Sequence, residues 1–481
     1  MKFNDVINAL KENNLLVSYD ESNISFDYIT YNSKDVKEST LFICKGASFK
    51  KEYLEEAITS GVTCYISESD YEVDVPKVIV NDIRRSLALV SGLFYKDDLY
   101  KIGITGTKGK TTTNYFIHNI LKNHLGYKPG ILATHYYYTG VEEGESHLTT
   151  PESLELHKYL NQMMNSDIGY MSMEVSSQAV LHERVYKMNF DIGCFLNIGP
   201  DHISDFEHKD FDDYFNCKLG FLKLCDKVLV YRHTDYFEEV MESVKDKEVI
   251  TFSFKYADYI IENIVNDKGL SFDLSHNGES KSYKISMAGR FNIINATCAI
   301  IASEIIGISY EDICKGLIET EISGRMNILY GKCPIIVDYA HNKVSAEALY
   351  ESIKGDYPGK TLKVVFGATG DKGPVRRYDL GDLAGKYADY VYLTSDDPGK
   401  VSVYDICDDI IECMGKYHHN YEIVVDRREA IRKAIHESTS DDVLAIIGKG
   451  DENFLIIGEE YIPYETDRVV VEEELSKIKE G

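Results

Sequence analysis

The chain has 481 residues, 44% of them hydrophobic, which is enough for roughly three domains with cores of their own. Its formal net charge of −27 argues against a nucleic acid or an anionic membrane as partner. The ten cysteines form no C-x-x-C pair, no apolar run approaches the ~20 residues of a membrane span, and no signal peptide is evident, so we expect a cytoplasmic protein with reduced thiols.

Residues 1–98 alternate short apolar runs with helical segments, which predicts a small α/β domain. The predicted strands are 40–44, 62–67 and 75–80, and the predicted helices are 51–60 and 84–95. Ser33 lies in a polar segment before the first strand, which on composition alone is typical of a surface loop. We expect a hinge at Asp97-Asp98.

A glycine-rich turn, Gly103 to Thr113, follows a short apolar strand at 100–104 and precedes a helix that ends near Gly126. Strand, glycine-rich turn and helix in this order predict a phosphate loop, because glycines let backbone N–H groups approach a polyphosphate and the helix N-terminus favours anions. Lys110 is then placed to reach the β/γ-phosphates, and the Thr111 hydroxyl to ligate Mg²⁺. The spacing is a compact G-x-x-G-K-T variant of the usual motif.

The second domain, 99–325, carries further candidates after its predicted strands. Glu174 ends an apolar run and suits either a Mg²⁺ ligand or a helix cap. Asp201 and His202 follow a strand at 191–196, and such turns gather at one edge of a parallel sheet. Lys218 lies among apolar residues of a predicted helix, 211–224, where a lysine ordinarily extends to solvent. Thr149 and Thr150 precede Pro151, a pattern that predicts a helix N-cap.

The third domain, 326–481, alternates strands and helices as a doubly wound parallel sheet does. Polar turns follow four of its strands and are expected to line one crevice. These turns begin at Asp338, Gly367, Thr394 and Gly448.

The ordered motifs resemble the Mur ligase family across nearly the whole chain, and within it the MurE group. The matching stretches are TLFICKGAS after Ser33, GITGTKGKTTT, TTP, MEVSSQAVLHERV, NIGPDHIS, YFNCK, GRFNIINA, SGRM, VDYAHN, FGATGDKG, TSDDPGK and GKGDEN. The resemblance implies an N-terminal UDP-binding α/β domain, a central phosphate-loop ATPase domain and a C-terminal Rossmann-like domain.

The resemblance also implies roles for individual residues. The expected catalytic residues are Lys110, Glu174, His202 and Lys218. Mg²⁺ would be held by Thr111, Glu174, His202 and Lys218, the last as a carbamate. ATP would contact Gly106, Thr107, Lys108, Gly109, Lys110, Thr111, Thr112, Asn295, Arg325, Asp338 and His341. The UDP-linked substrate would contact Ser33, Thr149, Thr150, Ser176 and Arg184. The incoming amino acid would face Arg377, Asp396, Asp397 and Glu452.

The implied reaction is ATP-dependent addition of an amino acid to the D-Glu γ-carboxylate of UDP-MurNAc-L-Ala-D-Glu, through an acyl-phosphate, by a monomer that uses only small-molecule substrates. Two departures from the diaminopimelate-adding members concern the amino acid. Their D-N-P-R is here Asp396-Asp397-Pro398-Gly399, and their G-K-G-H-E ends here in Asp451-Glu452. Losing a cation and gaining acidic groups favours L-lysine or another basic amino acid such as ornithine over meso-diaminopimelate.

Further departures are Lys108 in place of the usual Asn of the phosphate loop and Leu148 in place of the usual Asn before TTP. They keep two alternatives open. One is another ATP-dependent amide ligase on this scaffold, such as a MurF-like or folylpolyglutamate-type enzyme or a paralogue with a different carboxylate substrate. The other is a nucleotide-binding regulatory protein without ligase turnover.

Overall fold

The computed structural model describes residues 1–46, 49–201, 203, 207–266, 269–322, 326–370, 375–418 and 420–480. The chain forms two compact units. The first comprises Met1–Ile261, Ser275–Glu279 and Asn295–Gly316, and the second comprises Glu262–Leu274, Ser280–Ile294 and Leu317–Gly481.

The N-terminal part of the first unit is built on a five-stranded sheet of order β1-β5-β4-β3-β2, parallel except for β1. Its strands are β1 (Leu16–Tyr19), β2 (Tyr28–Thr30), β3 (Thr40–Ile43), β4 (Val62–Ser67) and β5 (Lys77–Val80). Its helices are α1 (Phe3–Glu12), α2 (Lys51–Thr59) and α3 (Ile83–Phe94). The predicted strands and helices of this part are confirmed. Helix α1 is an addition, and it buries Phe3, Val6 and Leu10 on one face at helical spacing.

The second sheet of the first unit has β6 (Tyr100–Thr105) at its centre, parallel to β10 (Tyr170–Glu174) on one side and β11 (Phe190–Phe195) on the other. Outward from β11 lie β12 (Cys225–Tyr231), β13 (Glu248–Ser253) and the start of β14 (Tyr259–Asn266). Outward from β10 lie β7 (Gly130–Leu132), β8 (Tyr137–Tyr138) and β9 (Glu143–Gly144). This register brings the carboxyl ends of β6, β10 and β11 to one edge, where the predicted phosphate loop begins.

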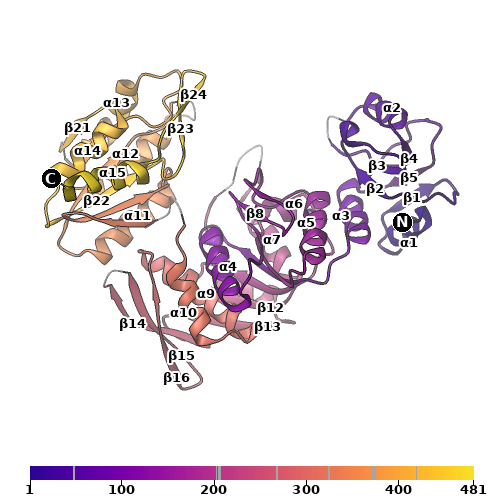
Figure 1. The fold of residues 1–481 in the computed structure, drawn as a ribbon, viewed down its shortest axis with the longest axis horizontal. Helices are drawn as coiled ribbons and strands as arrows, with labels where there is room; N and C mark the ends of the chain where they lie inside the picture. Colours follow the sequence, from indigo (N-terminus) through magenta and orange to yellow (C-terminus); the bar gives the residue numbers. More distant parts are fainter. Residues whose placement is uncertain are drawn as a thin grey trace. The chain divides into compact units, whose positions relative to one another are not determined.

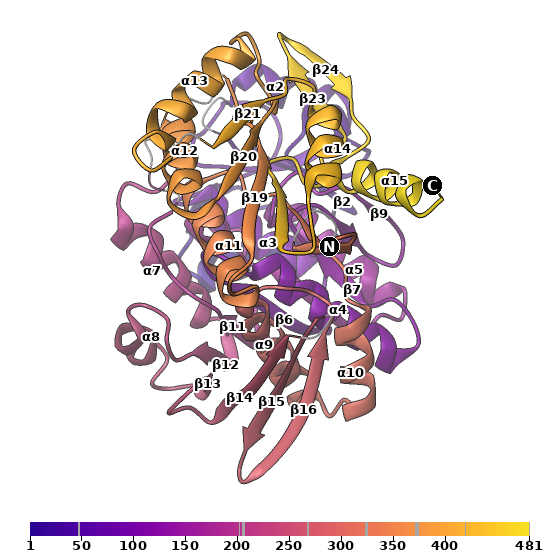
Figure 2. The same cartoon turned by 90° about the vertical axis from the view of Figure 1, so that its left-hand side faces the viewer.

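The helices of this region are shown in Figures 1 and 2, where Figure 2 labels α8, and each of them except α10 follows a strand in the chain. They are α4 (Lys110–Leu125), α5 (Ser153–Asn165), α6 (Ser177–Leu181), α7 (Phe211–Leu222), α8 (Phe237–Ser243), α9 (Arg290–Ile306) and α10 (Tyr310–Glu319). The strands β15 (Leu270–His276) and β16 (Glu279–Ile285) follow β14 in the sheet order. Gly126 ends α4 with a φ of 71°, as its predicted C-cap position requires.

The second unit contains a six-stranded sheet of order β17-β18-β22-β19-β20-β21, parallel except for β17. Figure 2 shows α11, α12 and α13 on one face of this sheet and α14 and α15 on the other, and two buried apolar clusters separate the layers. Its strands are β17 (Asn327–Tyr330), β18 (Pro334–Asp338), β19 (Thr361–Phe366), β20 (Tyr390–Leu393), β21 (Tyr421–Ile423) and β22 (Asp442–Ile447). Its helices are α11 (Lys343–Asp356), α12 (Val375–Tyr387), α13 (Val403–Met414), α14 (Arg427–Glu437) and α15 (Asp467–Glu480).

The α/β fold class and the doubly wound sheet are therefore confirmed, whereas the domain limits 1–98, 99–325 and 326–481 stay predictions. A hairpin of β23 (Phe454–Ile457) and β24 (Glu460–Pro463) and the helix α15 are additions to the predicted elements. Among the helices of the described residues, none combines the length and the apolar character that crossing a bilayer requires.

Candidate active site

The phosphate loop depends on glycine at its last position. Gly109 caps α4 with a φ of +88°, a conformation that L side chains rarely adopt. A Cβ atom at this position would lie 2.3 Å from the Asn295 Oδ1 atom. The structure thus places Asn295, from α9, directly against the loop, and its contact with ATP stays a prediction.

Two lysines converge on the loop backbone. The Lys110 ammonium donates to the carbonyl oxygens of Gly106 at 2.8 Å and Thr107 at 3.2 Å, and Lys218 Nζ donates to the same Gly106 oxygen at 2.9 Å. Lys218 is 1% exposed, and its burial, reinforced by the charge of Lys110, lowers its pKa well below the usual range. The expectation that a lysine in this helix extends to solvent is wrong here, because Lys218 lies on the face of α7 that packs toward the loop.

Glu174 is a completely buried carboxylate at the end of β10, as predicted. It accepts from the Thr111 hydroxyl at 3.0 Å, and from the Thr134 backbone N–H at 2.8 Å and hydroxyl at 3.0 Å. All three donors are neutral, although a buried carboxylate is best stabilised by a cation. This donor set fits a hard divalent ion beside Thr111 and Glu174. Thr134 is a part of the site that sequence reasoning missed, since nothing around it forms a motif.

The turn after β11 is held against the phosphate loop. Asn197 accepts from the Lys108 backbone N–H at 2.8 Å and donates to the Lys108 carbonyl at 3.1 Å. The Lys108 ammonium lies 3.3 Å from the Asp201 carboxylate, and the Thr107 hydroxyl lies 3.0 Å from the Tyr214 hydroxyl. Lys108, which departs from the Asn expected from the resemblance, is therefore engaged in the site. The predicted metal ligand His202 lies outside the described residues.

Some of the residues predicted for the UDP-linked substrate are hydrogen-bonded to the strand end at Glu174 or to its neighbours. Thr150 donates to the Glu174 carbonyl at 2.9 Å and accepts from the Ser176 backbone N–H at 3.1 Å. Arg184 donates to the Thr150 carbonyl at 3.0 Å, and Thr149 lies 3.3 Å from the Thr134 hydroxyl. Ser33 opens a short 3-10 helix in the N-terminal part, away from these described contacts.

The N-cap prediction for Thr149 and Thr150 is wrong. Helix α5 begins after Glu152, whose side chain makes no capping hydrogen bond. The Thr150 hydroxyl is used instead by the strand end at Glu174, which the local sequence does not reveal. Glu152 forms ion pairs with Arg184, at 2.8 Å, and with Lys45 from the N-terminal part. Lys45 was not among the predicted site residues.

In the second unit, three carboxylates surround one buried lysine. Lys449, which is 0% exposed, contacts Asp397 at 2.9 Å and Glu452 at 2.5 Å. Asp396 is 5% exposed, and burial, opposed by the charges of Arg427 and Lys449, raises its pKa to about 6. The Arg427 charge is already used by Asp467, which lies 2.7 Å away. This acidic cluster, formed by Asp396, Asp397 and Glu452, keeps two negative charges in excess when all its members are ionised.

The other predicted residues of the second unit make their described hydrogen bonds to partners outside the acidic cluster. Arg377 donates to Asp409 at 2.7 Å and to the Gly370 carbonyl at 2.5 Å. Asp338 accepts from the Met326 N–H at 2.8 Å, and His341 Nδ1 donates to the Tyr339 carbonyl at 2.9 Å. Arg325 lies outside the described residues. The Tyr339 hydroxyl, which sequence reasoning missed, donates to Glu452 at 2.8 Å.

The strand, the glycine loop and the Lys110, Thr111 and Glu174 side chains together define an α/β protein of the phosphate-loop nucleotide-binding class. The chain matches the model of the Mur ligase middle domain over residues 104–303, and that of the Mur ligase glutamate ligase domain over residues 324–450. It belongs to the Mur ligase family, which confirms the resemblance inferred from the motifs.

Curated relatives match over nearly the whole chain. The chain is 40% identical over 450 residues to the UDP-N-acetylmuramoyl-L-alanyl-D-glutamate--L-lysine ligase of Streptococcus mutans serotype c, covering 91% of this chain and 90% of that protein. It is 39% identical over 488 residues to the protein of the same name from Streptococcus pneumoniae serotype 2, covering 98% and 99%. A solved UDP-N-acetylmuramoyl-L-alanyl-D-glutamate--2,6-diaminopimelate ligase has the same fold, with a TM-score of 0.76 at 22% identity over 100% of this chain and 99% of that one.

Proposed function

We propose that this protein is an ATP-dependent ligase that joins L-lysine to the D-Glu γ-carboxylate of UDP-MurNAc-L-Ala-D-Glu, a step of peptidoglycan precursor synthesis. The observation that carries the choice of amino acid is the acidic cluster around Lys449, with Asp397 at 2.9 Å and Glu452 at 2.5 Å. The printed names of the relatives from Streptococcus mutans and Streptococcus pneumoniae support the same reaction.

The charge of this cluster favours a cationic side chain. A second carboxylate, as in diaminopimelate, would add a negative charge to a region that already has an excess of two. Gly399, in the left-handed region with a φ of 56°, occupies the place where diaminopimelate-adding members have arginine, so this position supplies no cation for a distal carboxylate, and the next residue, Lys400, is paired with Glu459. Repulsion and a missing partner thus act together against that substrate.

The chemistry follows from the poor reactivity of a carboxylate. One γ-carboxylate oxygen attacks the γ-phosphorus of ATP, the bond to the bridging oxygen breaks, and ADP leaves. The α-amine nitrogen of lysine then attacks the acyl carbon of the resulting acyl-phosphate, inorganic phosphate leaves, and the nitrogen loses a proton. Lys110 and the loop N–H groups offset the charge of the transferring group, and in this role Lys110 exchanges its carbonyl partners Gly106 and Thr107 for phosphate oxygens.

The buried Glu174 carboxylate and the Thr111 hydroxyl would hold Mg²⁺, which when bound would supply positive charge to the phosphates. The family resemblance adds His202, for a second Mg²⁺, and a carbamylated Lys218 as metal ligands. The neutral amine that burial favours at Lys218 is the form that reacts with CO₂ to give a carbamate. Thr134 holds Glu174 in place through two hydrogen bonds.

The test is phosphate release with ATP, Mg²⁺ and UDP-MurNAc-L-Ala-D-Glu, comparing L-lysine, L-ornithine, meso-diaminopimelate and no amino acid. We expect release that depends on the UDP-linked substrate and is selectively stimulated by L-lysine. Stimulation by diaminopimelate alone would refute the specificity argument while keeping the ligase. No release with any of the four would favour a paralogue with another carboxylate substrate or a regulatory nucleotide-binding protein.

We also propose that the enzyme acts as a monomer in the cytoplasm, where ATP and UDP-linked precursors are available. All ten cysteines are free thiols, which suits a reducing compartment. Sedimentation of the purified protein tests the monomer.

A further inference from the structure

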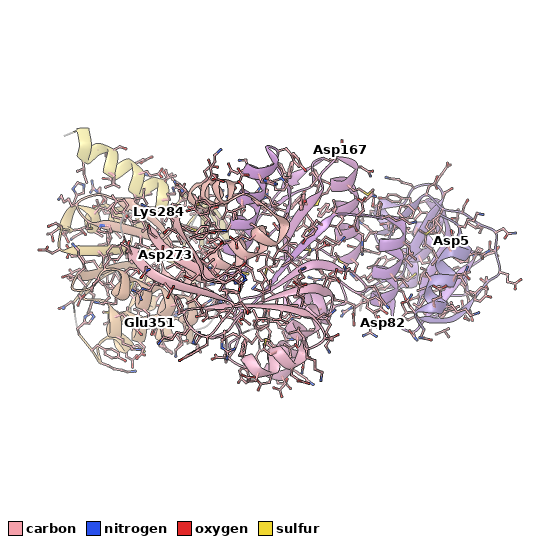
Figure 3. All side chains as sticks on the ribbon, turned by 90° about the horizontal axis from the view of Figure 1, so that it is seen from below. Asp5, Asp82, Asp167, Asp273, Lys284 and Glu351 are labelled. Atoms are coloured by element: carbon pink, nitrogen blue, oxygen red, sulfur yellow. The ribbon has the colours of Figure 1, made fainter. Side chains whose placement is uncertain are left out.

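A cavity of about 350 Å³ lies in the first unit, between helix α3 of the N-terminal part, helix α5 and the segment 186–189. Figure 1 shows α3 and α5 side by side, and Asp82, which caps α3 at the far end from the cavity, is labelled in Figure 3. The cavity is large enough for a small organic ligand. None of the residues proposed above to bind ATP, the UDP-linked substrate or the amino acid lines it.

His157 is a buried polar side chain in the lining of this cavity. It is 7% exposed, and both of its ring nitrogens are buried without a hydrogen-bond partner. The ring lies against Gly92, where a Cβ would come within 3.0 Å of His157 Cε1. Burial, opposed by the charge of Asp97 and aided by that of Lys101, lowers the pKa of His157 to about 4, so the ring is neutral at pH 7 and has one donor and one acceptor to offer. Two unpaired buried polar atoms are costly unless a ligand satisfies them.

The other lining residues indicate the polarity and the charge of a matching ligand. Leu89 and the buried Met188 form an apolar wall, whereas the exposed Lys96 and Lys187 lie at the rim. Lys101 is already paired with Asp97 at 2.5 Å, so these two charges cancel. The entrance of the cavity is therefore positively charged through Lys96 and Lys187, whereas its interior is apolar apart from the neutral imidazole of His157.

We propose that this cavity, the α3–α5 pocket, is a binding site for a small molecule with a planar apolar body and a single acidic group. The apolar body contacts Leu89 and Met188, a hydroxyl or ring nitrogen of the ligand pairs with His157, and the acidic group lies between Lys96 and Lys187.

The test titrates the full-length protein with 6-hydroxy-2-naphthoate and with its uncharged analogue 6-hydroxy-2-naphthamide, followed by calorimetry. Naphthyl emission gives a second readout, because the chain contains no tryptophan. We expect one saturable site per chain, with the acid binding at least tenfold more tightly than the amide. Lys96→Glu combined with Lys187→Glu should weaken binding of the acid at least tenfold. Lys158→Glu, an exposed lysine of α5 outside the pocket, should change it less than twofold.

A second variant tests the interior. Leu89→Trp fills the pocket from a half-buried wall position and should abolish binding, and its tryptophan emission reports whether the variant is folded. Absence of binding at millimolar probe, equal affinity for acid and amide, or binding that Leu89→Trp leaves intact would overturn the proposal. These measurements need neither ATP nor turnover, so failure of the proposed ligase activity is distinguishable from failure of the pocket.

Discussion

Replacing Lys218 by methionine is expected to stabilise the protein while removing its activity. Lys218 is 1% exposed and has a strongly lowered pKa, so the folded state bears the cost of desolvating an amine that is charged in the unfolded chain. The buried charge costs several kcal/mol. The lost hydrogen bond to Gly106, now 2.9 Å long, contributes about 1 kcal/mol. The difference predicts a gain of about 2 kcal/mol in the free energy of unfolding, or roughly 2 °C in midpoint for a chain of this length.

The sign of the pH dependence follows from the lowered pKa. The penalty is complete below the pKa of Lys218 in the folded state and fades as the pH rises toward the unfolded value of about 10.4. The advantage of Lys218→Met should therefore shrink between neutral pH and pH 10. Thermal unfolding followed by circular dichroism in degassed buffer measures it. Lys223→Met, at the exposed end of the same helix, is the matched control and should shift stability by less than about 0.5 kcal/mol.

Bicarbonate separates the structural role of Lys218 from its proposed role as a carbamate. Carbamylation converts the buried amine into an anion that a metal ion pairs with, so bicarbonate with Mg²⁺ should stabilise the wild type and leave Lys218→Met unchanged. Lys218→Ala should lose roughly 10²–10³ in rate, with partial recovery on adding acetate or propionate. A Lys218→Met variant that is less stable than the wild type, or a Lys218→Ala variant with full activity, would refute the reasoning.

Four further predictions concern the other parts of the site. Glu174→Gln places an amide beside the Thr134 N–H, so we expect a loss of about 1–3 kcal/mol in stability and of roughly 10²–10³ in ADP release; a normal rate would contradict the role of Glu174. Gly109→Ala puts its Cβ 2.3 Å from Asn295 Oδ1 and should weaken ATP binding, measured by equilibrium dialysis, more than tenfold. Because the pKa of Asp396 is raised to about 6, the KM for lysine should rise as the pH falls from 7.5 to 5.5. The second unit should become more stable over the same range, as this carboxylate protonates. Asp396→Asn should flatten both pH profiles. Gly399→Arg should shift preference from lysine toward diaminopimelate in the phosphate-release assay.

The phosphate loop and the elements around it were predictable because their signals are local. Glycine, lysine and threonine follow one strand at fixed spacing, and Glu174 ends a second strand that the parallel register sets beside the first. The hairpin β23–β24 was missed for the opposite reason. Its residues are mostly exposed, so they show no alternation of apolar and polar side chains.

The supporting residues of the site were not predictable from one sequence. Thr134 and Lys449 matter only through the side chains that the fold brings to them, Glu174 in one case and Asp397 in the other. Nothing in the neighbourhood of Thr134 distinguishes it from a surface threonine. Conversely, Thr150 has the sequence setting of an N-cap but uses its hydroxyl on the Glu174 carbonyl, because a strand end competes for it.

The burial of Glu174 and Lys218 beside one loop indicates how ligand binding and stability are linked. The described hydrogen bonds of Glu174 are with neutral donors, and Lys218 donates to a neutral carbonyl while the Asp201 carboxylate offsets its charge only in part. Ligands that bring a cation to Glu174 and phosphates to Lys110 relieve costs that the protein alone carries. Binding at about 100 times Kd would add about 2.7 kcal/mol to the folded state. Mg²⁺ and ATP together should consequently raise the unfolding midpoint more than the sum of their separate effects, and strictly additive effects would show that Glu174 and Lys110 act on their ligands independently.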